Sequence, residues 1–161
     1  MTSGRQIDPI ARFMQEHDET LLQLATMNRA TRMLAEHGWG EDAFRRVMGS
    51  VRFLEEEIGT HNAREEEALF PVLEKYVEGP TAMMRAEHRE LRKELRKLLS
   101  SSKTVARGGH SRQNLKQLQQ RSQVVVQLLV NHIHKENNIL FPLVQKFLTR
   151  DALREVARRM V

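Results

Sequence analysis

The chain contains no cysteine among its 161 residues. This absence excludes disulfide bonds, thiolate zinc sites, cysteine-ligated iron–sulfur clusters and thiol catalysis. Turn formers are also sparse, with eight glycines and four prolines, and aromatic residues make up only 5% of the sequence. The apolar content therefore comes from leucine, methionine, valine and alanine. Together with abundant Glu, Lys and Arg, this composition favours a mostly helical protein.

Long hydrophobic runs are missing as well. No stretch approaches the roughly 20 apolar residues that a membrane span needs. The N-terminal sequence MTSGRQIDPIARF lacks the apolar core of a secretory signal. We therefore expect a soluble, cytoplasmic protein that does not bind membranes. The net charge of +5 is modest, and the basic residues are not interleaved with aromatic side chains, so we expect no nucleic-acid partner.

Turn signals divide the chain into four long helical segments. The breaks contain glycine, proline or small polar residues, and they lie at residues 38–40, 79–81 and 100–111. Asp8 followed by Pro9 marks the first helix start. Four long helices with short loops predict an all-α, antiparallel up-down-up-down four-helix bundle over about residues 8–148. We expect Thr149 to cap a short C-terminal helix over about residues 149–160, and residues 1–161 to form a single domain.

Apolar residues recur every three or four positions along the second and fourth segments, as on one buried helix face. In the fourth segment the predicted inner stripe is Leu118, Ser122, Val125, Leu129, His132, Glu136, Ile139 and Leu143. Titratable residues thus occupy positions in a core stripe. Pro71 and Pro142 lie late in these two segments, where each should kink its helix or mark its last turns.

The two halves of the chain repeat one pattern. A single constant offset in residue number, the repeat offset, relates His17 to His88, His61 to His132, Glu65 to Glu136, and Pro71 to Pro142. A helical hairpin therefore appears twice in the sequence. We expect the bundle to have a pseudo-twofold axis, with matching residues facing one another across it.

The repeated histidines and glutamates point into the predicted core. His61 and Glu65 are four residues apart, which places both on one helix face about 6 Å apart, and the same holds in the second half. A buried, unpaired carboxylate is costly, and two at one level repel each other. Metal cations remove both costs. We predict a dinuclear metal site whose ligands are His17, His61, Glu65, His88, His132 and Glu136.

The ligand types narrow the choice of metal. Imidazole and carboxylate ligands without thiolate suit iron, with manganese or zinc as less favoured alternatives. Carboxylates on facing helices of a bundle are the usual ligands of di-iron or di-manganese pairs. If Glu65 and Glu136 bridge the two ions, coordination positions stay open for water, a bridging oxo group, dioxygen, peroxide or nitric oxide.

Three further glutamates are candidates for groups that orient the ligands or form an acidic entry path for iron. Glu16 and Glu87 immediately precede two of the predicted ligand histidines, and Glu57 lies one turn before His61 on the same helix face. The position that the repeat offset relates to Glu57 holds Leu128, so this carboxylate is added in one half only. The alternative is that all three are ordinary surface charges.

The combined pattern resembles that of the hemerythrin-like family, also called the HHE cation-binding domain. The matching residues are His17, His61-x-x-x-Glu65 with Leu69-Phe70-Pro71, His88, and His132-x-x-x-Glu136 with Leu140-Phe141-Pro142. The resemblance covers about residues 8–148. It implies an antiparallel four-helix bundle around a non-haem pair of iron ions with an oxo or hydroxo bridge.

The sequence departs from the oxygen-carrying members at two positions. Those proteins have a second histidine where this chain has Arg92, and an aspartate where it has Asn137. They therefore have five histidine ligands, whereas four are present here. The set of four histidines and two glutamates is more similar to the branch linked to iron–sulfur cluster repair and nitric oxide stress. That branch carries an N-terminal segment with cysteine, a residue this sequence lacks.

Four functions are compatible with these residues. We favour a carrier or sensor that binds dioxygen or nitric oxide at a carboxylate-bridged pair of iron ions. The same centre could instead be an enzyme acting on nitric oxide or peroxide, or an iron donor in iron–sulfur cluster repair. A helical interaction module with a metal-free polar network is the fourth. A sensor would act through a separate protein partner, which the sequence does not identify.

Overall fold

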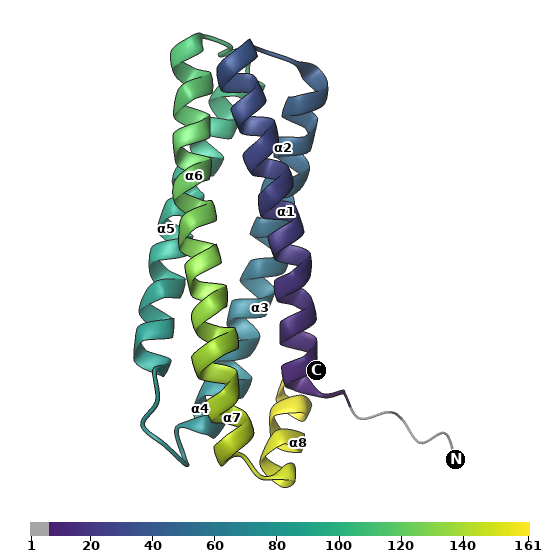
Figure 1. Ribbon diagram of the computed structural model, residues 1–161, viewed down its shortest axis with the longest axis vertical. Helices are drawn as coiled ribbons and strands as arrows, with labels where there is room; N and C mark the ends of the chain where they lie inside the picture. Colours follow the sequence, from purple (N-terminus) through teal and green to yellow (C-terminus); the bar gives the residue numbers. More distant parts are fainter. Residues whose placement is uncertain (1–6) are drawn as a thin grey trace, which may run out of the picture.

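The computed structural model describes residues 7–161, and every regular element in that range is helical. Residues 1–6, part of the N-terminal sequence and of the domain expected above, lie outside the described residues. Four long helical rods run alternately up and down along the longest axis, and a short helix closes the lower end (Figure 1). The predicted all-α, antiparallel bundle with a C-terminal helix is confirmed.

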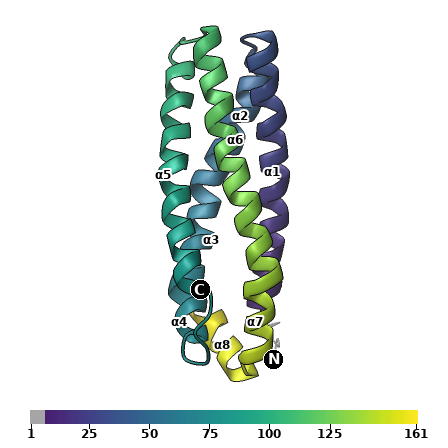
Figure 2. The same cartoon turned by 60° about the vertical axis from the view of Figure 1, so that its left-hand side comes forward.

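The first and third rods are single helices, α1 (Pro9–His37) and α5 (Thr81–Ala106). The second rod consists of α2 (Glu41–Phe53), η1 (Leu54–Ile58), α3 (Gly59–Arg64), η2 (Glu65–Leu69) and α4 (Phe70–Leu73). The fourth consists of α6 (Arg112–Lys135), η3 (Glu136–Leu140) and α7 (Phe141–Phe147). The η elements are π-helical turns within otherwise α-helical rods. Helix α6 packs against α1 and α5, and α8 (Arg150–Arg159) packs across the lower end against α1, η2 and α4 (Figure 2).

Local capping groups fix the helix ends. The Oδ1 of Asp8 accepts a hydrogen bond from the backbone N–H of Ile10 at 3.0 Å, which satisfies a free donor at the start of α1. Gly38 ends that helix with a φ of 90°, a conformation that side chains with a Cβ disfavour. Thr149 Oγ1 accepts from the backbone N–H of Ala152 at 3.1 Å and caps α8. These predicted boundaries are confirmed.

The third rod is longer than the sequence predicted. The loop expected over residues 100–111 is wrong in its first half, because α5 continues to Ala106. Ser102 and Val105 are fully buried on the core side. The Ser102 hydroxyl donates to the carbonyl of Leu98, one turn earlier, at 2.9 Å. A serine satisfied in this way can stay inside a helix, so the polar run does not end α5.

The π-helical turns η2 and η3 begin at the two predicted glutamate ligands and are related by the repeat offset. A π turn holds one residue more than an α turn, and such turns are frequent at functional sites. Beyond η3 the buried stripe therefore passes to Leu140 and Val144. Ile139, predicted to lie inside, is 48% exposed, and Leu143 is only partly buried. The predicted end of the inner stripe is thus wrong by one residue.

Pro71 and Pro142 lie just beyond η2 and η3, where each is the second residue of the following helix, α4 or α7. Proline lacks an N–H group, so one carbonyl of the preceding turn has no helical donor. The wider π turn accommodates this break without ending the rod at once. As expected, Pro71 marks the last turns of its rod, which reaches only Leu73, whereas α7 continues to Phe147.

The apolar core is divided into two parts by a polar layer. The upper part fills most of the bundle and includes Leu24, Ile58, Leu91 and Leu129. The lower part lies against α8 and includes Phe13, Ala68, Met84 and Leu140. Each rod carries buried polar side chains between these two clusters. Within residues 7–161, no helix is both long and apolar enough to cross a membrane.

Candidate metal centre

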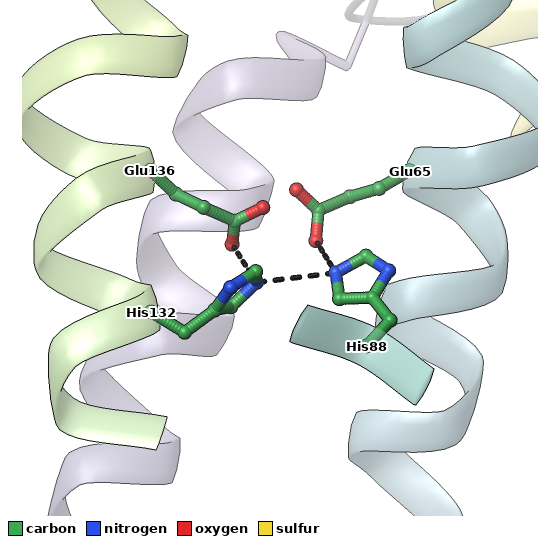
Figure 3. Close-up of side chains that lie close together, drawn as sticks. All are labelled: Glu65, His88, His132 and Glu136. Atoms are coloured by element: carbon green, nitrogen blue, oxygen red, sulfur yellow. Dashed lines mark hydrogen bonds and ion pairs between the residues drawn. The ribbon is translucent and has the colours of Figure 1, made fainter. Parts of the chain in front are cut away.

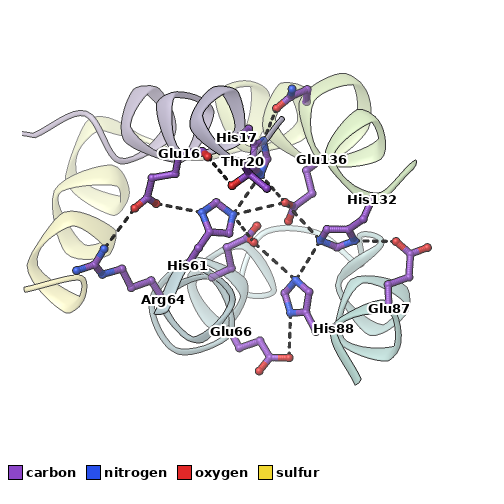
Figure 4. A network of polar contacts seen from close by, with 12 residues as sticks. Glu16, His17, Thr20, His61, Arg64, Glu66, Glu87, His88, His132 and Glu136 are labelled. Carbon is purple, nitrogen blue, oxygen red and sulfur yellow. Dashed lines mark hydrogen bonds and ion pairs between the residues drawn. The ribbon is translucent and has the colours of Figure 1, made fainter. Parts of the chain in front are cut away.

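The six predicted ligands meet in the polar layer, and all four rods contribute. Figure 4 labels the four histidines and Glu136, and Figure 3 labels Glu65. They are His17 on α1, His61 on α3, Glu65 at the start of η2, His88 on α5, His132 on α6 and Glu136 at the start of η3. None of these residues is more than 5% exposed. The apolar clusters on either side place them in an environment that disfavours uncompensated charge.

The four imidazoles form two pairs. The Nε2 atoms of His17 and His61 lie 3.1 Å apart, and those of His88 and His132 are also 3.1 Å apart. Two nitrogen ligands about 2.1 Å from one ion, at a right angle to each other, would lie about 3.0 Å apart. Each pair thus has the spacing of two ligands on a shared cation. The repeat offset converts one pair into the other.

The carboxylates of Glu65 and Glu136 point toward each other beside His88 and His132 (Figure 3). Glu65 Oε1 is 2.9 Å from His61 Nε2 in one pair and 3.6 Å from His88 Nε2 in the other. Glu136 Oε1 also reaches both pairs. It is 2.9 Å from His17 Nε2 in the first pair and 3.4 Å from His132 Nε2 in the second. Each carboxylate therefore reaches a histidine of both pairs, which is the placement that a bridging ligand needs.

Several oxygens of these carboxylates lack hydrogen-bond partners in the described part of the chain. They are both oxygens of Glu65 and Oε2 of Glu136, all of them buried. Glu65 Oε1 is close to His61 Nε2, but this contact is not a hydrogen bond. Buried carboxylate oxygens are costly unless they are paired or coordinated. The residues form two buried groups that could hold an ion, namely His17, His61 and Glu136, and Glu65, His88, His132 and Glu136. A donor set of imidazole and carboxylate without thiolate fits iron, manganese or zinc, so the residues fit a pair of metal ions.

The pKa values of the buried side chains in the polar layer shift in opposite directions. Burial, reinforced by the charge of Glu136, raises the pKa of Glu65 well above its ordinary value. Burial disfavours a charged His132, but the hydrogen bond and charge of Glu136, together with other carboxylates, raise the pKa of His132 to about 9. Burial and then the charge of His132 lower the pKa of His88 to about 4. Opposed shifts of this kind are typical of functional sites, and a cation would replace the protons that now balance the charge.

Two of the three additional glutamates contact ligand histidines from outside the layer. Glu16 Oε1 lies 3.0 Å from Nδ1 of His61, and Glu87 Oε1 lies 2.8 Å from Nδ1 of His132 (Figure 4). Each glutamate thus serves a histidine of the neighbouring rod, not the one that follows it in sequence. The third, Glu57, is exposed. The buried stripe runs through Leu54, Ile58 and His61, and Glu57 lies beside it on the solvent side.

Sequence reasoning missed two further contacts. Glu66 Oε1 lies 3.2 Å from Nδ1 of His88, and Asn137 Oδ1 lies 2.8 Å from Nδ1 of His17. Both residues directly follow a predicted glutamate ligand, and the repeat offset relates one to the other. That offset was the available signal. With these contacts, each of the four buried histidines has a side-chain oxygen at Nδ1, the nitrogen that faces away from the centre.

Comparison with known proteins decides the family. The family model described as the hemerythrin HHE cation binding domain matches residues 8–144. The chain belongs to this family. All six residues of the buried layer lie inside the matched range, so a metal centre is supported both by the family and by the His/Glu cluster.

Individual relatives have a more specific description. Over 137 residues the chain is 28% identical to the iron-sulfur cluster repair protein YtfE of Yersinia pseudotuberculosis serotype IB (strain PB1/+). The match covers 83% of this chain and 61% of that protein. YtfE of Yersinia pestis (strain Pestoides F) matches with the same identity and coverage. The chain therefore spans about three fifths of the length of the curated relatives it matches.

Proposed function

We propose that this chain holds two iron ions in the polar layer and that the pair binds a small diatomic molecule, dioxygen or nitric oxide, as a carrier or sensor. One observation carries the proposal. Each of the two buried carboxylates reaches a histidine of both pairs, and three of their oxygens have no other partner in the described residues. The relatives' description adds support for iron as the metal.

The six side chains would coordinate the two ions as follows. His17 and His61 would hold one ion, and His88 and His132 the other. Glu65 and Glu136 would bridge the ions and balance part of their charge. Two nitrogens and two carboxylate oxygens per ion leave positions for an oxo or hydroxo bridge and for an added ligand. Iron bound here would supply redox chemistry and affinity for dioxygen or nitric oxide.

Aromatic side chains hold two of the histidine rings in place. The ring of Phe141 stacks on His17 with centroids 5.5 Å apart, and the ring of Phe70 stacks on His88 at 5.9 Å. These two phenylalanines are again related by the repeat offset. Together with the apolar clusters they exclude water and fix the direction of Nε2, which lowers the cost of arranging the ligands.

We further propose that the whole chain forms one domain, since α8 packs against α1, η2 and α4.

Exposure of reduced, iron-loaded protein to each gas tests the proposal. Nitric oxide added in the absence of oxygen should produce a new visible absorption band in the wild-type protein. Dioxygen added to a separate sample should do the same. The His61→Ala variant should give no such band. His134→Ala is the matched control, because His134 is exposed on α6 and should leave the band unchanged. Absence of a band with both gases would contradict the proposal, and sustained gas consumption faster than that of free iron would favour an enzyme.

A second candidate, iron donation for cluster repair, is favoured by the description of the relatives. The structure adds that Glu57, Glu16 and Glu19 line one surface hollow, and that Glu16 contacts His61. Iron transfer to a chelator should then slow in Glu57→Gln but not in Glu55→Gln, an exposed residue of the same turn. Tight iron retention by the wild-type protein would exclude donation.

A further inference from the structure

The partners of the outward-facing histidine nitrogens are symmetric in one respect. His61 and His132 each meet a glutamate, at 3.0 and 2.8 Å. Each of those glutamates also contacts a basic residue one position before a ligand glutamate. The contacts are Arg64 with Glu16 and Lys135 with Glu87, and the repeat offset relates both members of one contact to those of the other. For this pair of histidines the two halves of the centre are therefore equivalent in charge.

For the other two histidines the halves are not equivalent. Nδ1 of His88 meets the carboxylate of Glu66, whereas Nδ1 of His17 meets the amide oxygen of Asn137. The two acceptors occupy matching positions in the repeat. Among the described side chains that meet the four Nδ1 atoms, Asn137 is the one neutral acceptor. The half with His88 and His132 thus has two carboxylate acceptors, and the half with His17 and His61 has one.

This difference acts on metal affinity through the imidazole ring. When Nε2 binds a cation, Nδ1 carries the hydrogen and donates it to the oxygen. A carboxylate acceptor raises the basicity of the ring and strengthens its bond to the cation, and a neutral amide does so less. The contact of Glu66 is longer than that of Asn137, and its side chain is 27% exposed. These features reduce the effect of its charge, but an amide brings no negative charge at any distance.

We propose that the two cation positions are unequal, so that the half formed by His88 and His132 binds a divalent metal first and more tightly. The half formed by His17 and His61 is the exchangeable position, from which the metal leaves first. This inference rests on the proposed metal centre and goes beyond it by assigning an order to its two positions. Glu66 and Asn137 act through the histidines as positioning residues.

Stepwise titration of the metal-free protein with Co²⁺ tests the order, with visible absorption as the readout. The wild-type protein should bind two ions in two steps whose dissociation constants differ by about tenfold or more. Glu66→Gln should weaken the first step about 10- to 100-fold, so that the steps merge. Asn137→Asp should tighten the second step, so that the steps merge at higher affinity. The double variant should separate them again with the order of the halves reversed.

Matched controls are available one residue further along. Glu67 and Asn138 are exposed, are themselves related by the repeat offset, and differ from each other as Glu66 and Asn137 do. Glu67→Gln and Asn138→Asp should leave both steps unchanged. If Glu66→Gln fails to fold, as judged by circular dichroism, Asn137→Asp still tests the inference by adding an acceptor.

Two outcomes overturn the inference, and they differ in meaning. Two equal steps in the wild-type protein, or steps that neither variant changes, would contradict the order while leaving the metal centre in place. Failure of the folded wild-type protein to bind any Co²⁺ would overturn both the order and the proposed function.

Discussion

The Nε2 atoms of His17 and His61 lie 3.1 Å apart in a layer where neither residue is more than 3% exposed. Only one of these two nitrogens can donate a hydrogen bond to the other, so their contact satisfies one lone pair at most. A cation between them satisfies both nitrogens and the adjacent carboxylates at once. The folded state of this bundle should therefore be stabilised by metal.

Removal of the metal should lower the thermal stability of the protein. A cation present at about 100 times its dissociation constant adds about 2.7 kcal/mol to the free energy of unfolding. For a domain of this size that corresponds to a rise in Tm of about 5–10 °C. Thermal unfolding followed by circular dichroism, with and without anaerobic Fe²⁺, measures the difference. A Tm that does not respond to any of iron, manganese or zinc would favour a metal-free helical module.

The variant Glu65→Gln should have opposite effects on the metal-free and the metal-loaded protein. Burial and the charge of Glu136 raise the pKa of Glu65, so an ionised Glu65 destabilises the metal-free fold. Glutamine removes that charge, and its amide can donate to the carboxylate opposite. We expect the metal-free variant to be more stable than wild type by about 1–3 kcal/mol at neutral pH, and its metal affinity to be lost. Denaturant unfolding of both forms checks the result, and destabilisation of the metal-free variant would contradict it.

Metal affinity should fall as the pH is lowered. In the metal-free protein the pKa of His132 is raised to about 9, because the contacts with Glu136 and other carboxylates outweigh burial. A proton must therefore leave His132 before a cation can bind at about pH 7.5. Calorimetric titrations in two buffers with different ionisation enthalpies should give different heats at this pH. The difference should shrink as the pH rises through about 9, and equal heats at neutral pH would count against the charged histidine.

A variant at the far end of the bundle should affect stability without affecting the metal. The ring of Trp39 stacks on His110 with centroids 3.6 Å apart and planes within 7°, and this contact joins the loops after α1 and α5. Trp39→Ala should lower the free energy of unfolding by about 1 kcal/mol and leave the metal content unchanged. Loss of bound metal in this variant would show that the two ends of the bundle are coupled.

The sequence predicts which side chains meet in the polar layer, because an α-helix fixes the direction of each side chain by its position. The spacing of His61 and Glu65, and its repetition in the second half of the chain, is sufficient to bring these side chains into one layer. Sequence periodicity fails where the helix is not α-helical. Beyond η3 the buried stripe moves from Ile139 to Leu140. No feature of composition or spacing marks these turns.

The outer contacts were harder to predict for a different reason. Glu66 and Asn137 each follow an inward-facing glutamate, so the helical period places them beside the core face. Both lie within the π turns η2 and η3, one residue after each turn begins, and they reach histidines on neighbouring rods. Their pairing also depends on which rods are neighbours, and that is a property of the assembled bundle. The repeat offset was sufficient to show that they correspond, but not to show what they contact.

The most direct test of the metal centre is the metal content of protein purified from iron-supplemented cells, compared with that of His61→Ala and of the exposed control His134→Ala. We predict two iron ions per chain in the wild-type protein and in His134→Ala, and loss of iron in His61→Ala with the helical content preserved. Zinc alone or no metal in a folded wild-type protein would contradict the di-iron centre. The bundle would then stand, but the binding of dioxygen or nitric oxide would not.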